Sequence, residues 1–400
     1  MDAYDIIIAG GGCAGLSLAL HLQEAGVLAG RRTLVVDRAP KAENDRTWCF
    51  WGNPQTPFAH LAIQQWTSMN FYCPEGEVHE KLDPYTYYLL RGIDFYRYAR
   101  ERLKDDGNIE WRYGDIRSFH PRKNGAELVV DGDTISCTYL FNSCVHLVRP
   151  MSPAGTEAHF LWQHFKGWTV ESPDPVFQPD TATLMDFRMP QAGEVRFGYV
   201  LPFSPNEALV EFTAFAPETW PDEAYDPALR EYLQQGLGVS AYSVKETEQG
   251  AIPMTDRQFA RQSGDHVFHI GTAGGDVKPT TGYAFQRIQE VTRHIARHWR
   301  SRGYPRAPVP SPRRFAFYDT LLLHILEREG QWGRPIFSRL FRKNRIPLIM
   351  KFLAERTNPI EEAKIFASLP FKPFLQAVWE NWGYKGQTNP FLPKQAKAFK

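Results

Sequence analysis

The sequence predicts an α/β protein with three parts: a parallel-sheet domain, an inserted and mostly antiparallel β domain, and a helical carboxyl-terminal region. The first part is indicated by two glycine-rich turns that each follow a short apolar strand, one near residue 10 and one near residue 271. The second is indicated by strands with period-two alternation between residues 181 and 216. The third begins at about residue 315, after a proline-rich linker, where a helical pattern takes over.

Composition places the chain among globular proteins and excludes several classes of function. Of its 400 residues, 43% are hydrophobic and 23% are charged, and the formal net charge of +1 predicts no nucleic-acid partner. Neither the five cysteines nor the twelve histidines show the spacing of a metal site, so we expect no metal. No targeting segment precedes the first strand and no apolar run reaches the ~20 residues of a membrane span, which predicts a cytoplasmic protein.

The segment "YDIIIAGGGCAGLSLALHLQEAG" carries the most specific local signal, a G-x-G-x-x-G turn between a buried strand and a helix. In this pattern Gly10 permits a tight turn, Gly12 lets the backbone approach a pyrophosphate, and Gly15 lets helix and strand pack closely. The next strand, "RTLVVD", ends in Asp37, about 20 residues past the glycines, where an acid binds ribose hydroxyls. The segment predicts a Rossmann-like dinucleotide site whose expected contacts are Gly10, Gly12, Cys13, Ala14, Gly15, Asp37 and Arg38.

On this segment alone the dinucleotide is NAD or FAD, and the rest of the chain favours FAD. After Arg38 the sequence does not return at once to a strand–helix unit, and the second glycine-rich segment comes late, as in FAD proteins of the glutathione-reductase type. That segment, "IGTAGGDVKPTTG", is similar to the flavoprotein hydroxylase pattern G-D-x-x-H-x-x-x-P-x-x-G, with Thr272 in place of the acid. We expect its Pro-to-Gly turn to open a helix whose N–H groups face the isoalloxazine. Further expected FAD contacts are Arg91, Gly271, Thr272, Pro279, Thr281 and Gly282.

Longer strings extend this similarity to nearly the whole chain. They include "DRTWCFW" at residues 45–51, "QHFKGW" at 163–168, "LMDFR" at 184–188 and "YVLPFSPNEALVEFT" at 199–213. With these strings the chain resembles the lycopene cyclases, most of all the bacterial β-cyclases, within a wider flavoprotein group that includes aromatic hydroxylases and geranylgeranyl reductases. One departure is Asn142, where relatives tend to have Asp.

The resemblance implies a redox-neutral cyclisation of the acyclic end groups of lycopene, or of a related carotenoid, to β-ionone-type rings. It also implies FAD working in its reduced form, with NAD(P)H as the reductant. Two alternatives stay open: a flavin-dependent monooxygenase or polyene reductase acting on a large apolar substrate, and a non-catalytic flavin or carotenoid carrier. An aromatic share of 14% suits a protein that handles a large conjugated ligand.

The strand "ALVEFTAF" carries a carboxylate among apolar residues on both of its faces. Glu211 is therefore either an edge residue that reaches water or an acid in apolar surroundings, where desolvation raises a carboxyl pKa by up to about 3–5 units. A neutral acid of this kind is a proton donor, and the resemblance implies that Glu211 is the catalytic acid. Asp186 is a lesser candidate, with an ion pair to Arg188 as its alternative role. Arg46 and Trp48 are candidates for contact with cofactor or substrate, although Trp48 equally fits a core position.

We expect a discontinuous FAD-binding domain and an inserted substrate domain. The FAD-binding domain takes residues 1–72, 95–150 and 250–304, the substrate domain takes 73–94 and 151–249, and the helical region takes 305–400. Within the last region, basic and apolar residues interleave at 331–357, which suits either a helix pair lying on an anionic bilayer or a helical cap with a solvated basic face. Because a lycopene-like substrate dissolves in lipid, we expect a peripheral association with the inner face of the cell membrane.

Overall fold

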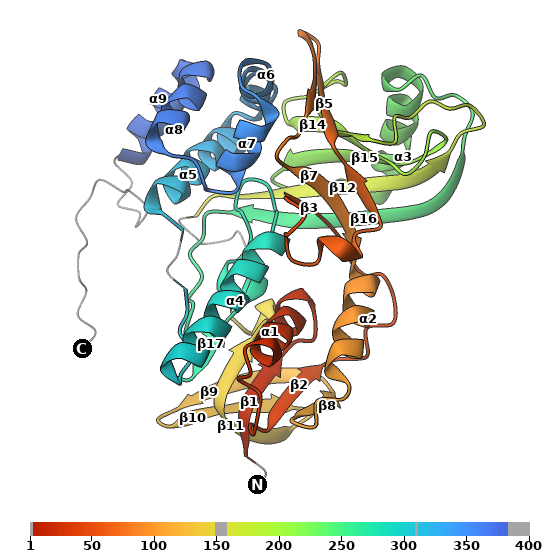
Figure 1. Ribbon diagram of the computed structural model, residues 1–400. Coiled ribbons are helices and arrows are strands. Elements are labelled where there is room, and N and C mark those ends of the chain that lie inside the picture. The colour runs from red at the N-terminus through yellow and green to blue at the C-terminus, as the bar shows by residue number, and fades with distance from the viewer. Residues whose placement is uncertain (1–2, 149–157, 309–310, 383–400) are drawn as a thin grey trace.

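A computed structural model describes residues 3–148, 158–308 and 311–382 of the chain. Figure 1 shows a lower α/β part that contains the amino-terminal strand, an upper part built on a broad β-sheet, and a group of helices beside that sheet. The chain passes between the lower and upper parts more than once, so neither part is a continuous stretch of sequence. The predicted class, α/β with a largely antiparallel insertion and a helical carboxyl-terminal region, is confirmed.

The lower part is organised around a mainly parallel sheet of the strands β1 (Tyr4–Ala9), β2 (Thr33–Asp37), β8 (Ile109–Tyr113), β9 (Ile116–Arg122), β10 (Gly125–Val130), β11 (Asp133–Asn142) and β17 (Val267–His269). Their order is β8-β2-β1-β11-β10-β9, with β17 paired to β11. The pairs among β8, β2, β1, β11 and β17 are parallel, whereas β9, β10 and β11 form an antiparallel extension.

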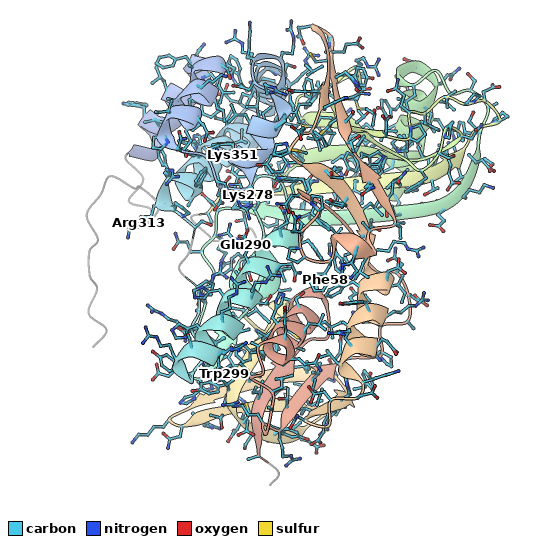
Figure 2. The ribbon with its side chains drawn as sticks, in the orientation of Figure 1. Phe58, Lys278, Glu290, Trp299, Arg313 and Lys351 are labelled. Carbon is cyan, nitrogen blue, oxygen red and sulfur yellow. The ribbon has the colours of Figure 1, made fainter. Side chains whose placement is uncertain are left out.

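Both faces of this sheet are covered, which explains why β1 is a run of buried apolar residues instead of an alternating strand. One face packs against the helices α1 (Cys13–Glu24), α2 (Gly92–Leu103) and α4 (Phe285–Arg302). On the other face, side chains of β1 and β2 pack against those of the antiparallel extension formed by β9, β10 and β11. Phe58, labelled in Figure 2, joins the three helices, because its ring contacts His21 of α1, Phe95 of α2 and Phe285 of α4.

The upper part is built on the strands β5 (Ser68–Cys73), β6 (Gly76–Lys81), β12 (Phe160–Glu171), β13 (Thr181–Asp186), β14 (Val195–Pro202), β15 (Glu207–Ala216) and β16 (Ser243–Thr255). In the order β16-β12-β15-β14-β13-β5-β6, all neighbours are antiparallel except β13 and β5. One face of this sheet packs against α3 (Asp222–Glu231). The other faces a small sheet of β3 (Thr47–Gly52), β4 (Gln64–Trp66) and β7 (Thr86–Arg91), together with the carboxyl-terminal helices.

The carboxyl-terminal helices are α5 (Arg313–Arg328), α6 (Gly333–Lys343), α7 (Ile346–Leu353), α8 (Pro359–Ser368) and α9 (Phe371–Trp382). Helices α6 and α7 occupy the segment 331–357, in which basic and apolar residues interleave. Its apolar side chains face the protein interior, and the buried ones are Ile336, Leu340, Phe341, Ile346, Ile349 and Met350. None of the helices in the described part of the chain has both the length and the apolar character needed to cross a membrane.

Candidate active site

The amino-terminal glycines form a backbone turn with no room for side chains at two of its positions. Gly10 has a φ of +102°, and a Cβ at Gly15 would lie 1.9 Å from the carbonyl oxygen of Gly10. At Gly12, by contrast, a Cβ would meet no described atom within 4 Å, so the turn is open on that side. No described side chain caps α1, and its first turn carries no acid. The N–H groups at this helix end therefore face the opening, an arrangement that fits a pyrophosphate.

Asp37 ends β2 beside this turn. Its carboxylate accepts a hydrogen bond from the Gly11 N–H at 3.0 Å and another from the Arg38 N–H at 2.6 Å. A cavity of about 440 Å³ opens next to it, and its wall includes Asp37, Arg38, Lys41, Asp45, Cys144 and His146. Carboxylates that accept from sugar hydroxyls and cations that face phosphate are both present, which suits the ribose half of a dinucleotide. Burial raises the pKa of Cys13, within the glycine turn, to about 12, so its thiol is neutral.

The second glycine segment lies against the first. Gly271 has a φ of +62°, and a Cβ there would lie 2.7 Å from the Cβ of Ala14 in α1. Gly282 has a φ of +71°, and its Cβ would lie 2.8 Å from Ile252 of β16. The helix expected to open at Pro279 begins later, at Phe285, because the backbone first makes a turn that Gly282 closes with an N–H bond to the Lys278 carbonyl at 2.9 Å.

The loop of this segment contains a buried acid that the sequence analysis missed. Asp276 accepts a hydrogen bond from the Gly271 N–H at 2.7 Å and forms an ion pair with Arg261. Burial raises the pKa of this carboxyl, against the lowering effect of the guanidinium. Thr272, where related hydroxylases have their acid, bonds through its backbone carbonyl to Gly275. The signal for the acid was present in the sequence, since Asp276 directly follows the paired glycines.

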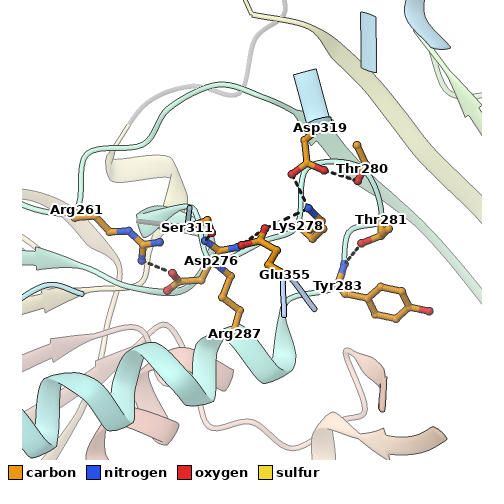
Figure 3. Close-up of polar contacts among 10 residues, drawn as sticks. All are labelled: Arg261, Asp276, Lys278, Thr280, Thr281, Tyr283, Arg287, Ser311, Asp319 and Glu355. Carbon is orange, nitrogen blue, oxygen red and sulfur yellow. Dashed lines mark hydrogen bonds and ion pairs between the residues drawn. The ribbon is translucent and has the colours of Figure 1, made fainter. Parts of the chain in front are cut away.

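A network of buried charges connects the same loop to the carboxyl-terminal helices (Figure 3). Lys278 forms ion pairs with Asp319 of α5 at 2.7 Å and with Glu355, which follows α7, at 3.2 Å. Thr280 donates a hydrogen bond to Asp319 at 2.8 Å, and Arg287 of α4 pairs with Glu355 at 3.2 Å. The helical region therefore holds the second glycine segment in place. Spacing in the sequence carries no signal for this network, because its members come from four separate segments.

Glu211 lies in the middle of β15, on the face of the upper sheet that is turned toward the small sheet. It is directly opposite Gly167 of β12 on one side and Tyr199 of β14 on the other. Glu248 of β16 is directly opposite Gly167 on the other edge of β12. Glu211 is half-buried, and the loss of solvent together with the charge of Glu248 holds the pKa of its carboxyl well above the usual range. The structure thus places this acid in surroundings that favour its neutral form.

Three tyrosines connect the strand of Glu211 to the second glycine segment. The hydroxyl of Tyr87, on β7, forms hydrogen bonds of 2.7 Å with the hydroxyls of Tyr199 and Tyr283. Tyr283 directly follows Gly282. Burial raises the pKa of each of these hydroxyls, and it raises the pKa of the neighbouring Cys49 thiol to about 12. Apart from Glu248, the groups named here around Glu211 are therefore polar but uncharged.

Asp186 is not part of this cluster. It is fully buried at the end of β13, paired with Gly198 of β14, and so belongs to the opposite face of the sheet. Its carboxylate forms an ion pair with Arg188 at 2.6 Å and accepts a hydrogen bond from the Tyr232 hydroxyl at 3.0 Å. The alternative that the sequence analysis left open, pairing with Arg188, is the arrangement in the structure.

The remaining candidates lie around the lower helices. Trp48 packs against the rings of Phe95 and Tyr96 from α2 and of Phe285 from α4, as a core residue does. Arg46 is exposed and donates to the backbone carbonyl of the preceding residue. Arg91 is exposed as well, and its guanidinium is paired with Asp94 in the first turn of α2. Asn142 is buried, and its side chain bonds to the backbone two residues later. Contact of these residues with a ligand stays a prediction.

Solved structures with this architecture are flavoproteins and related enzymes. The chain is similar to a flavoprotein/dehydrogenase from Cytophaga hutchinsonii, with a TM-score of 0.59, 13% identity, and coverage of 95% of this chain and 100% of that chain. It is also similar to a geranylgeranyl bacteriochlorophyll reductase-like protein from Thermoplasma acidophilum, with a TM-score of 0.56, 12% identity, and coverage of 96% and 97%. At this identity the likeness establishes the fold.

Sequence comparison is more specific. The chain is 24% identical to a lycopene beta-cyclase from Pantoea ananas, with 94% of this chain and 97% of the relative covered. It is also 24% identical to a lycopene beta-cyclase from Paracoccus sp., with 94% and 96% covered. The family described as lycopene cyclase protein matches residues 5–378. Since that match takes in both glycine segments, the upper sheet and most of the carboxyl-terminal helices, the chain belongs to the lycopene cyclase family.

Proposed function

We propose that this protein is an enzyme that closes the acyclic end groups of lycopene, or of a related carotenoid, into β-ionone-type rings without net oxidation. The observation that carries the proposal is the position of Glu211, an acid beside a series of neutral, hydrogen-bonded tyrosines that leads to the second glycine segment. Family membership supports it, as do the names of the relatives that match along most of the chain, which are lycopene beta-cyclases.

The cofactor that the fold suggests is FAD, and the residues present fit it. We infer that the turn from Gly10 to Gly15 holds the pyrophosphate, that Asp37 binds the ribose, and that the turn at Gly282 lies against the ring system. Gln163 supports the last inference, because its amide oxygen is buried with no partner among the described residues, 3.6 Å from where a Cβ of Gly282 would stand. When bound and reduced, with NAD(P)H as the expected reductant, FAD supplies negative charge beside the substrate.

The side chains of the site supply an acid and neighbours that are poor nucleophiles. Adding a proton to the terminal double bond requires a carboxyl group that is neutral before the reaction, and the surroundings of Glu211 favour that state. The tertiary carbocation that follows must be stabilised by groups that do not trap it. Neutral hydroxyls on aromatic rings meet this need, because the faces of aromatic rings attract cations and the hydroxyls are not ionised.

The main alternative is a flavin-dependent monooxygenase or polyene reductase, which the same fold also supports. Either reaction changes the mass of the substrate, whereas cyclisation preserves it. Anaerobic incubation with lycopene, FAD and NADPH, followed by chromatography and mass spectrometry, is expected to yield a cyclised product of unchanged mass. A requirement for oxygen, or a product that has gained oxygen or hydrogen, would overturn the proposal.

The role of Glu211 is tested by Glu211→Gln. We expect this variant to bind FAD as the wild type does and to lose about 100-fold or more of the cyclase activity, the usual contribution of a general acid. Asp186→Asn is the matched control, because it changes another acid of the same sheet that lies on the opposite face. Full activity in Glu211→Gln would remove the residue from the mechanism.

We further infer that the protein associates peripherally with the inner face of the cell membrane, where an insoluble polyene is found. The apolar side chains of 331–357 are engaged inside the protein, so another surface is needed. Helices α8 and α9 offer one, with large apolar side chains that are 51% to 82% exposed: Ile360, Phe371, Leu375 and Trp379. Exposed Lys364 and Lys372 on the same helices add positive charge for anionic lipid.

Flotation with anionic vesicles tests this surface. The double substitution Phe371→Ser/Trp379→Ser is expected to leave most of the protein unbound. Tyr304→Ser is the control, since it removes another exposed aromatic ring, one that follows α4 and does not belong to these helices. Unchanged flotation of the double variant would contradict the inference. So would loss of binding only when basic residues of α6, such as Arg339 and Arg342, are replaced by Gln.

A further inference from the structure

We propose that Glu248 is a positioning residue for the acid, and that Glu211 and Glu248 share one proton across the space left by Gly167. The inference deepens the proposed function and rests on it, because it assigns a partner to the proton donor of that reaction. Nothing in the sequence pattern singles out Glu248, which lies in the long strand β16 among several other charged residues.

The register of three strands brings the two carboxyl groups together. In the order β15-β12-β16, Glu211 and Glu248 are each directly opposite Gly167 and therefore point to the same face of the sheet. Two residues separated by an intervening strand are normally kept apart by the side chain between them. Here that side chain is absent, and the stems of the two glutamate side chains both approach the space above the glycine.

The space above Gly167 is filled by neighbouring side chains. A Cβ at this position would lie 2.8 Å from the Cγ of Glu211, 3.0 Å from the Cδ1 of Leu209 and 3.3 Å from the Cγ of Glu248. The contacts with Glu211 and Glu248 are with the stems of their side chains, so even alanine would push the carboxyl groups away from their present positions. The backbone of Gly167 is extended within β12, so the glycine is explained by this close approach and not by a special backbone conformation.

No positive charge balances the two carboxyl groups, so one of them must keep its proton. Within the described residues, no lysine, arginine or histidine forms an ion pair with either glutamate. The groups that face the pair are neutral: Tyr199 from β14, Tyr87 from β7, Cys49 from β3 and Tyr283 from the second glycine segment. Two carboxylates in contact without a counter-ion do not both ionise, because their repulsion raises the free energy of the doubly charged state.

The shared proton closes the proton balance of the proposed reaction. The Glu211 carboxyl gives its proton to the less substituted carbon of the terminal double bond, which leaves a tertiary carbocation of charge +1. Both glutamates are then carboxylates that face this cation. After ring closure, the carbon next to the cationic centre loses a proton to form the new double bond, and the pair takes that proton back. No electron is gained or lost, and the site returns to its starting state with one proton.

The experiment measures the protonation of the pair directly and then its effect on activity. In the holoenzyme without substrate, an infrared titration follows the carbonyl band of the protonated carboxyl, which is assigned by its loss in Glu211→Gln. In Glu248→Gln the band is expected to disappear at a pH lower by about 1 unit or more, because the neighbouring negative charge is gone. The alkaline limb of cyclase activity should move in the same direction. Glu246→Gln, an exposed acid two residues away on the same strand, should change neither measurement.

Gly167→Ala provides a second variant that keeps both carboxyl groups. Its Cβ separates them, so the band and the activity limb should shift in the direction seen for Glu248→Gln. An unchanged titration in both variants would refute the shared proton. If the titration shifts as expected but the wild type gives no cyclised product, the proposed function fails and the shared proton stands. If the wild type cyclises lycopene and neither variant shifts the titration, the proposed function stands without it.

Discussion

Replacing Lys278 by methionine is expected to destabilise the protein strongly, because it leaves buried carboxylates with too little positive charge. The side chains of Lys278, Asp319 and Glu355 are 8%, 6% and 11% exposed. After the substitution Arg287 still faces Glu355, but Asp319 keeps only the hydrogen bond from Thr280. Methionine is a flexible side chain that fills irregular space in a core, so the change is chiefly one of charge.

The expected loss is large compared with that of a surface pair. Breaking a buried ion pair by removing one partner costs about 3–5 kcal/mol, whereas an exposed pair contributes about 0–1 kcal/mol. An unfolding entropy of about 2.1 cal/mol/K per residue corresponds to about 0.8 kcal/mol/K for the 400-residue chain. The loss therefore lowers Tm by about 4–6 °C when the chain unfolds in one transition.

Thermal and urea unfolding, followed by circular dichroism, measure this loss in Lys278→Met. The control is Lys278→Met/Asp319→Asn, which removes both charges, keeps an acceptor for Thr280 and leaves the Glu355–Arg287 pair balanced. We expect the double variant to recover at least half of the stability lost by the single one. A loss below about 1 kcal/mol in the single variant would show that the pair behaves as an exposed one. A double variant no more stable than the single one would equally refute the reasoning.

Three further predictions concern other parts of the chain. Gly15→Ala places a Cβ 1.9 Å from the carbonyl oxygen of Gly10. Overpacking of about 1–3 kcal/mol should weaken FAD binding by about 10-fold or more, which flavin fluorescence measures. Unchanged affinity would contradict the proposed pyrophosphate site. Asp186→Asn should lower stability by about 1–3 kcal/mol and keep cyclase activity per folded molecule, whereas loss of activity at unchanged stability would give this acid a catalytic role. Burial lowers the pKa of His21, His164 and His269 from 6.5 to about 4. As the pH falls, the unfolded chain therefore takes up protons first, and stability should decrease between pH 6.5 and about 4. Urea midpoints that do not change over this range would contradict these shifts.

Features that depend on neighbouring residues were predictable from the sequence. The turn at Gly10–Gly15 needs glycine for local reasons: Gly10 has a positive φ, and a Cβ at Gly15 would meet the carbonyl oxygen of Gly10. The alternating segments that became β13, β14 and β15 follow from the pleat of a strand. The helix after the second glycine segment was placed too early, because the turn before it is held by Lys278, whose ion-pair partners are distant in the sequence.

The two acids in apolar strands show where such prediction stops. Glu211 and Asp186 have similar sequence surroundings, yet one faces Gly167 and Tyr199, and the other pairs with Gly198 on the opposite face. Which face a residue takes depends on the register between strands, and a shift of one residue would reverse it. Register is set by packing across the whole sheet, so the sequence alone offered both acids as candidates.

By itself, the sequence determined the α/β class, the two glycine segments and the resemblance to lycopene cyclases, because each is encoded by residues close together in the chain. Only the tertiary structure decided that Glu211 meets Glu248 above a glycine, and that Tyr87 bonds to Tyr283 across 196 positions of sequence. It also decided where the apolar residues of 331–357 point. An amphipathic helix has the same pattern whether its apolar face packs on lipid or on protein, and here the core of the upper sheet was the partner available.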